Sequence, residues 1–125
     1  LVAVNALYLA VKQNHAALLR VAGVDAVYLR GIEPVELRVV PGSHRPEQYG
    51  ADVEEIAADD ADWLLWSGDL AIDSTPTEPR RGDVIKVNGE EYEVVPRNEV
   101  EPYRYTDQTR QVFRVFSVRV HGNAA

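Results

Sequence analysis

The sequence predicts an α+β protein that is mainly β: a small β-barrel or sandwich of about six short strands, with one N-terminal helix packed outside and two long loops. Apolar residues recur at helical spacing near the amino end and at every second position afterwards. Glycine, proline and asparagine separate the alternating runs, as turns between strands require. The 125 residues are a usual length for one domain, so we expect a single domain over 1–125.

The helix is expected over residues 5–22. Its apolar positions, Leu7 and Val11 among them, recur at spacings near three and four. We expect Asn5 to cap its start and Gly23 to end it. The apolar stripe covers only part of the circumference, so the helix is expected to lie on the rest of the protein.

The clearest local signal is Asn88-Gly89, which separates the alternating runs 84–87 and 92–95. Both residue types tolerate the positive φ that a two-residue hairpin turn needs, so this segment predicts a tight hairpin.

The expected barrel covers residues 26–120. The other predicted strands are 27–30, 35–40, 53–57, 62–66 and 111–120. A turn at 31–34 joins the first two into a hairpin. A helical turn is the competing interpretation of the acidic region that precedes residue 62.

Two stretches are expected to be long exposed loops, 67–83 and 97–109. The first is rich in Ser, Thr, Pro and Gly, a composition that excludes regular structure. The second contains Pro102 and two tyrosines. Long loops in small domains often carry the function, so both are candidates for contact with partners.

Composition excludes several classes of function. The absence of cysteine removes disulfides, thiolate nucleophiles and cysteine-based metal sites. The net charge of -7 argues against a protein that binds nucleic acid by neutralising phosphates. No apolar run is long enough to span a bilayer and no signal peptide is evident, so we expect a soluble protein.

The remaining polar residues assemble no catalytic or metal-binding motif. His15, His44 and His121 lack the spacing of metal ligands. The acids between 52 and 62 lack the order of a calcium-binding loop, so a solvated acidic face is expected, or a surface for an arginine-bearing partner. We therefore expect no enzyme, no cofactor and no metal.

Arg81-Gly82-Asp83 spells an integrin-binding tripeptide. Because it lies just before a predicted strand, we interpret it as a turn in which Gly82 supplies backbone freedom.

Trp63 and Trp66 are candidate interface residues. In a strand, positions three apart face opposite sides, so at most one of the two belongs to the core. The other is expected to anchor an interface.

Tyr103, Arg104 and Tyr105 form an aromatic and basic group that could contact nucleic acid. The net charge and the nearby acids favour packing of this loop on the barrel, or contact with a protein partner.

Several segments together resemble the head-closure proteins of tailed bacteriophages, also called head-tail joining or stopper proteins, with relatives in prophages and gene transfer agents. The resemblance is carried, in order, by residues 16–19, 27–31, 79–85, 89–96, 102–107 and 113–115.

This resemblance implies a virion structural protein of the neck, at the head-tail junction, that forms a homo-oligomeric ring. The ring would join the portal or adaptor above to the tail terminator or tail below, and would help to retain packaged DNA. DNA would pass through its channel without sequence-specific binding, and no membrane is involved. Assembly would take place in the host cytoplasm.

The resemblance also implies roles for the two loops. The candidate channel or gating residues are Asp69, Asp73, Ser74, Thr75 and Thr77. The candidate docking residues are Tyr103, Arg104, Tyr105 and Asp107. The alternative is a stand-alone small β-barrel binding module that recognises a peptide or nucleic acid through residues 103–105.

Overall fold

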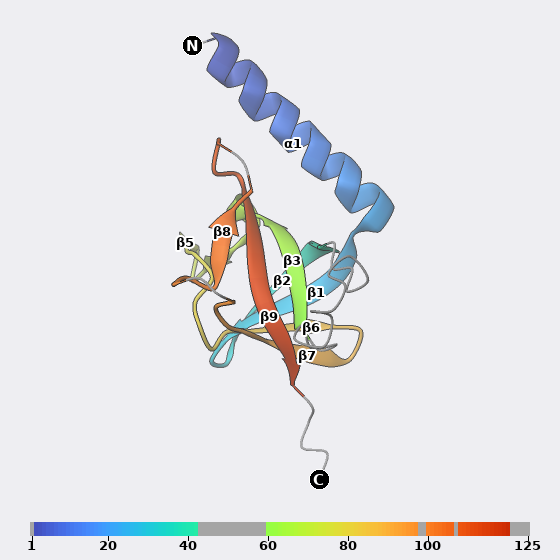
Figure 1. Ribbon diagram of the computed structural model, residues 1–125, viewed down its shortest axis with the longest axis vertical. Helices are drawn as coiled ribbons and strands as arrows, with labels where there is room; N and C mark the ends of the chain where they lie inside the picture. The colour runs from blue at the N-terminus through green and yellow to red at the C-terminus, as the bar shows by residue number, and fades with distance from the viewer. Residues whose placement is uncertain (1, 43–59, 98–99, 107, 121–125) are drawn as a thin grey trace, which may run out of the picture.

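The chain folds as one N-terminal helix followed by a closed six-stranded antiparallel barrel that carries one extra strand (Figure 1). This is a computed structural model, and it describes residues 2–42, 60–97, 100–106 and 108–120. The predicted fold class is confirmed, and the barrel rather than the sandwich is the observed form. The predicted strand at 53–57, as well as His44, Asp107 and His121, lies outside the described residues.

The elements follow one another along the chain with short connections. They are α1 (Val2–Ala22), β1 (Val24–Arg30), β2 (Glu33–Pro41), β3 (Asp60–Trp66), the 3-10 turn η2 (Ser67–Asp69), β4 (Ala71–Ile72), β5 (Thr75–Pro76), β6 (Val84–Val87), β7 (Glu90–Val94), β8 (Tyr103–Tyr105) and β9 (Val112–Val120).

Strand β9 closes the barrel. The strand order is β3-β2-β1-β6-β7-β9, and β9 returns to pair with β3 from Asp60↔Val118 to Trp66↔Val112. The opposite edge of β9 pairs with β7 near its carboxyl end and with β8 near its amino end. A single nine-residue strand therefore contacts three others.

The two predicted tight hairpins are present. Asn88 and Gly89 adopt φ values of 52° and 81° between β6 and β7, as a two-residue turn with both positions at positive φ requires. Gly31 has a φ of 64° in the turn between β1 and β2.

Alternate side chains of every barrel strand meet in one apolar core. Its fully buried members are Tyr28, Val39, Leu65, Leu70, Ile85, Val94 and Val115. Leu70 lies outside the barrel strands, in the segment predicted as an exposed loop. Part of that loop is therefore held against the core.

The helix begins earlier than predicted. It starts at Val2, so Asn5 lies inside it and the prediction that Asn5 caps its start is wrong. Residues 2–4 contain no glycine or proline that would stop the helix from extending. Its end is as predicted: the Gly23 amide donates to the Leu19 carbonyl at 3.0 Å, and a Cβ on Gly23 would lie 2.4 Å from that oxygen.

Both predicted loops contain regular structure. In 67–83, β4 and β5 form a two-stranded ribbon whose turn residues, Asp73 and Ser74, have φ values of 56° and 63°. The prediction missed this ribbon because neither turn residue is glycine. In 97–109, β8 joins the edge of β9 despite Pro102 immediately before it.

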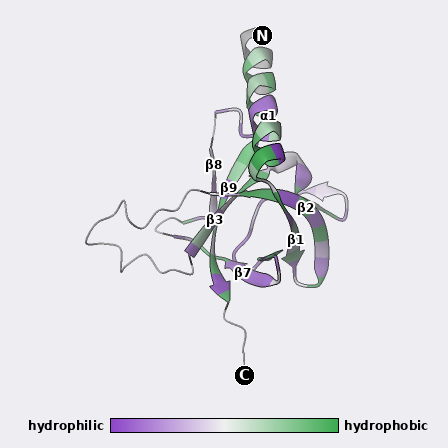
Figure 2. Ribbon diagram, turned by 90° about the vertical axis from the view of Figure 1, so that its right-hand side faces the viewer, coloured by the Kyte–Doolittle hydropathy of each residue, from purple (hydrophilic) through white to green (hydrophobic). Residues whose placement is uncertain are grey.

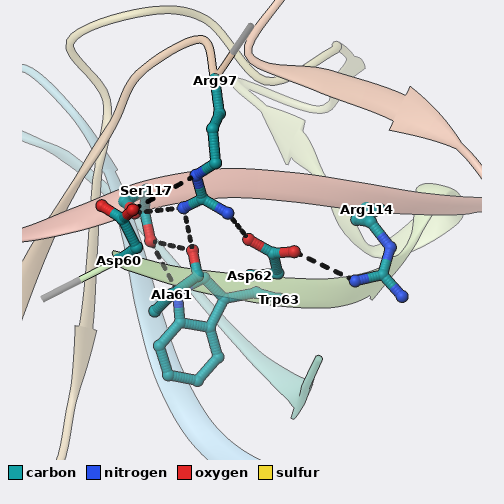
Figure 3. A network of polar contacts seen from close by, with 7 residues as sticks. All are labelled: Asp60, Ala61, Asp62, Trp63, Arg97, Arg114 and Ser117. Atoms are coloured by element: carbon teal, nitrogen blue, oxygen red, sulfur yellow. Dashed lines mark hydrogen bonds and ion pairs between the residues drawn. The ribbon is translucent and has the colours of Figure 1, made fainter. Parts of the chain in front are cut away.

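A polar network fastens the closing pair β3 and β9 (Figure 3). Arg97 forms a charged hydrogen bond with Asp62 on β3, and its Nη2 donates to the Ser117 carbonyl on β9 at 2.8 Å. Arg114 donates to the other Asp62 oxygen at 3.1 Å. The Asp62 side chain is only 11% exposed. Its carboxylate is thus neutralised within the chain and belongs to no solvated acidic face.

The same network reaches into the core. Trp63 Nε1 donates to the Ser117 hydroxyl at 2.9 Å, and that hydroxyl donates to the Ala61 carbonyl at 2.9 Å. Asp60 lies 3.8 Å from Arg97 Nε. The buried polar groups on both strands therefore satisfy one another.

We predict that Arg97→Met lowers the free energy of unfolding by about 2 kcal/mol, because Asp62 and the Ser117 carbonyl lose a charged donor in a partly buried site. Urea denaturation measures this. Lys86→Met is the matched control: it breaks an exposed pair with Glu91, 3.6 Å apart, and should cost less than about 1 kcal/mol. Equal losses for both variants would contradict the role given to Arg97.

Candidate functional site

The predicted channel residues separate into two groups. Asp73, Ser74 and Thr75 lie exposed at the tip of the β4–β5 ribbon. Asp69 lies in η2, and Thr77 lies half-buried at the base of the ribbon. The structure thus brings three of the five predicted residues together at one projecting turn.

The base of the ribbon is fastened to β1 by Arg30. Its Nη1 donates to the Thr77 hydroxyl at 2.9 Å, and its Nη2 donates to the Glu78 carbonyl at 2.8 Å. The backbone adds a further tie, since the Thr77 amide donates to the Leu70 carbonyl at 3.1 Å. Both limbs of the ribbon are therefore held at its base.

Asp83 orients the Arg30 guanidinium. Arg30 Nε donates to one carboxylate oxygen at 3.1 Å and Nη2 to the other at 2.9 Å, which is a bidentate ion pair. The buried Tyr28 hydroxyl donates to the same carboxylate, as does the Arg80 amide at 3.0 Å. Asp83 is only 4% exposed, and its two oxygens accept four donors.

This arrangement raises two pKa values. Burial, followed by the hydrogen bond to Asp83, raises the pKa of the Tyr28 phenol well above its usual range. The hydrogen bond to Asp83 raises the pKa of the Arg30 guanidinium. Tyr28 and Arg30 therefore stay protonated at any physiological pH, and both remain donors to Asp83.

The same geometry decides how the Arg81-Gly82-Asp83 tripeptide is used. Gly82 has a φ of 94°, and the Asp83 amide donates to the Arg80 carbonyl at 3.0 Å. The predicted turn is confirmed. A buried carboxylate cannot serve as an exposed ligand for a receptor.

The predicted docking residues pack on β9. Tyr103 meets Phe113 edge to face with ring centroids 5.2 Å apart, and Tyr105 lies 5.1 Å from the same ring. Arg104, between them, points outward and is exposed. The Arg110 guanidinium lies 5.7 Å from the centre of the Tyr105 ring. Packing of this loop on the barrel is therefore observed.

The two loops meet. Glu78 hydrogen-bonds to the Tyr103 hydroxyl, and burial followed by this bond raises the pKa of Tyr103 to about 12. An open groove between them is lined by residues of both loops, including Thr77, Glu78, Tyr105 and Arg110. The ribbon and the docking loop consequently form one continuous surface.

The two tryptophans divide as their spacing predicts. Trp63 is 5% exposed and packs edge to face on Tyr92 in the barrel, with centroids 5.0 Å apart, so its surface is used inside the core. Trp66 is half-buried and stacks on His15 of α1 at 5.7 Å. Trp66 is the one that remains a candidate interface residue, and it already joins helix to barrel.

His15 is buried at this junction. Its Nε2 atom has no hydrogen-bond partner among the described residues. Burial lowers the pKa of His15, and the nearby Asp69 carboxylate partly opposes this. Burial also raises the pKa of Asp69, against the attraction of His15. Lys12 lines the same pocket.

The residues that anchor the loops were not predicted as site residues. Arg30, Asp83 and Arg97 looked like ordinary strand-end and loop charges. For Asp83 the available signal was its place directly after a glycine turn and before an apolar strand, where a carboxylate can accept nearby backbone amides.

These features define a class of protein: a small closed β-barrel whose distinctive polar side chains hold loops in place. Within the described ranges, no group of three or more His, Asp or Glu side chains is arranged to hold a metal ion. No described helix has the length and hydropathy needed to cross a bilayer.

Comparison with known families then identifies the chain. A family model of the phage head-tail joining protein matches residues 4–124, from the helix to beyond the end of β9, so the chain belongs to this family. No curated protein and no solved structure matches it. Membership gives the chain a structural role at the joint between phage head and tail, as a virion component that interacts with other head and tail proteins. Families of this kind are typically not enzymatic.

We predict that Asp83→Asn lowers the free energy of unfolding by about 3 kcal/mol, because it leaves the partly buried Arg30 charge without its counter-ion. Trypsin cleavage after Arg80 and Arg81 should also accelerate as the ribbon base loosens. Unfolding in urea and limited proteolysis measure the two effects. Asp73→Asn, at the exposed tip of the same ribbon, is the control and should change neither.

We predict that the junction of α1 and the barrel loses stability as the pH falls. Because the folded-state pKa of His15 lies below its unfolded value of about 6.5, neutral His15 stabilises the fold above that value, and the contribution is lost as the pH drops through it. His15→Phe keeps a ring against Trp66 and removes the titration.

Thermal melting at about pH 7.5 and pH 5.5 brackets this pKa. The fall in melting temperature should be smaller for His15→Phe than for the parent. Asp69 acts in the opposite direction, since its raised pKa favours the protonated form in the folded state. Both proteins are therefore also compared with Asp69→Asn. Identical pH profiles would refute the assignment to His15.

Proposed function

We propose that the chain forms a ring at the neck of the virion, between the portal or adaptor and the tail, and that the ring helps to retain packaged DNA. The observation that carries this proposal is the β4–β5 ribbon: a projecting turn with an acidic tip, held at its base by Arg30 on Thr77 and Glu78. A ribbon anchored in this way keeps its direction when a partner presses on it.

In the proposed ring, Asp73, Ser74 and Thr75 face the channel. The tip carries one carboxylate and no basic residue, and a carboxylate repels the phosphate backbone. Repeated around the ring, these tips would obstruct the channel while giving DNA no cationic surface on which to adhere.

The docking loop serves the axial contact in this proposal. Tyr103 and Tyr105 fix it to Phe113, so that the Arg104 side chain is presented outward from a rigid strand. Rigid presentation lowers the entropy that a partner protein must overcome on binding. A neighbouring ring, above or below, is the proposed partner.

The proposal predicts that shortening the ribbon releases DNA without dissolving the neck. Replacing residues 72–75 by Asn-Gly joins Ala71 to Pro76 with a two-residue turn, which leaves the barrel and the Arg30 anchor intact. Particles carrying this variant should contain less nuclease-protected DNA than the parent.

The control for this experiment is Asp73→Asn with Ser74→Gly, which keeps both the length and the positive φ of the tip. It should retain most of the DNA. Cryo-electron microscopy of the same particles shows whether the chain is present as a ring at the neck. Full DNA retention by the shortened variant in such rings would remove the gating role and leave the joining role.

A further inference from the structure

Helix α1 extends beyond the barrel. Its 21 residues span about 32 Å at 1.5 Å per residue. The barrel contacts begin near Val11 and continue through the buried His15 to Leu19, while Leu7 and Leu9 are exposed. Figure 1 shows the amino-terminal half of the helix rising clear of the strands.

The exposed side of this helix is apolar. Leu7, Val11, Asn14, Leu18 and Val21 alternate at spacings of four and three residues, which places them on one line along the helix. Leu7 is 44% exposed, Leu18 39% and Val21 88%. Figure 2 shows hydrophobic colour along much of α1. An apolar stripe of this length on a protein surface marks a site of association.

Charge indicates what covers the stripe. The helix carries Lys12 and Arg20 and no acidic residue, a formal charge of +2; the whole chain has -7, so the rest of the chain carries -9. Two such helices repel each other weakly, whereas a helix and the acidic remainder of another copy attract each other.

The barrel offers a groove of about 650 Å³ that suits this helix. It lies over the outer side of β1, β2, β6 and β7, with Val27 paired between Glu36 on one side and Lys86 on the other. Asp25, Glu36 and Glu91 line it, against Arg38 and Lys86. In Figure 1, β6 and β7 lie at the end of the barrel away from the amino terminus, so the helix of the same chain does not reach them.

We infer that α1 of one copy docks, through the stripe from Leu7 to Val21, into the β1–β2–β6–β7 groove of a second copy. The two surfaces differ, so the contact is head-to-tail, the kind of contact that generates a closed ring when its rotation closes. This inference rests on the proposed ring and names the surfaces that build it.

The absence of cysteine in the chain allows a direct test. Leu18→Cys and Glu36→Cys are made separately, checked for unchanged circular dichroism and melting temperature, mixed, and oxidised. The expected result is a mixed disulfide dimer at several-fold higher yield than either variant gives alone. Ser74→Cys, exposed on the ribbon tip, replaces Glu36→Cys in the control mixture and should give only the background yield.

Charge reversal supplies a second measurement. Lys12→Glu with Arg20→Glu, introduced into the Leu18→Cys chain, should lower the mixed-dimer yield several-fold. Preferred linkage of Leu18→Cys to itself would show helix-to-helix association and overturn the inference. Background yield in purified protein and in assembled particles would also overturn it.

The inference and the proposed function fail in different ways. Particles with a ring of this chain at the neck but no Leu18–Glu36 linkage would refute only the docking mode. Strong linkage in purified protein, with no ring of this chain at the neck, would refute the proposed function and leave the docking mode standing.

Discussion

The bidentate pair of Arg30 and Asp83 is the interaction on which the arrangement of the loops depends. A carboxylate that is 4% exposed stabilises the fold only if its hydrogen bonds are satisfied, and here Tyr28, Arg30 and the Arg80 amide satisfy it together. Because Arg30 also donates to Thr77 and Glu78, the same guanidinium fixes the ribbon base. The core, the turn before β6 and the projecting ribbon are thus joined at one point.

A second network does the corresponding work on the other side of the barrel. Arg97 lies beyond the end of β7, and it joins β3 to β9 through Asp62 and the Ser117 carbonyl. Gly42 is part of the same closure: its amide donates to the Asp62 carbonyl at 2.7 Å, and a Cβ there would lie 2.9 Å from the Asp62 Cβ. Two arginine-centred networks therefore hold the seams of a barrel whose interior is otherwise almost wholly apolar.

The sequence was informative where local physics determines structure. Asn88-Gly89, the period-two runs and Gly23 at the helix end predicted elements that the structure contains. It was less informative where distant residues decide. The β4–β5 ribbon forms around Asp73 and Ser74, which lack the usual glycine signal, and Leu70 becomes core only because the strands surround it.

The candidate site was predicted only in part for the same reason. Composition alone pointed to residues 73–75 and 103–105 as loop residues, and these do lie on the surface of two adjoining loops. The partners that hold those loops, Arg30 with Asp83 and Tyr103 with Glu78, are separated by 53 and 25 positions, and no local pattern links them. Family resemblance supplied the biological role, which no side-chain pattern in this chain would have given.

The Arg30 anchor has a mechanical consequence. A force applied to the ribbon tip passes through Thr77 and Glu78 into the guanidinium, and from there into the backbone of β1. That strand is hydrogen-bonded to β2 over its full length and to β6 over three register positions, so the load is shared by parallel rows of bonds instead of opening one bond at a time. A pressurised capsid would thus act on a lever whose fulcrum is the barrel wall itself.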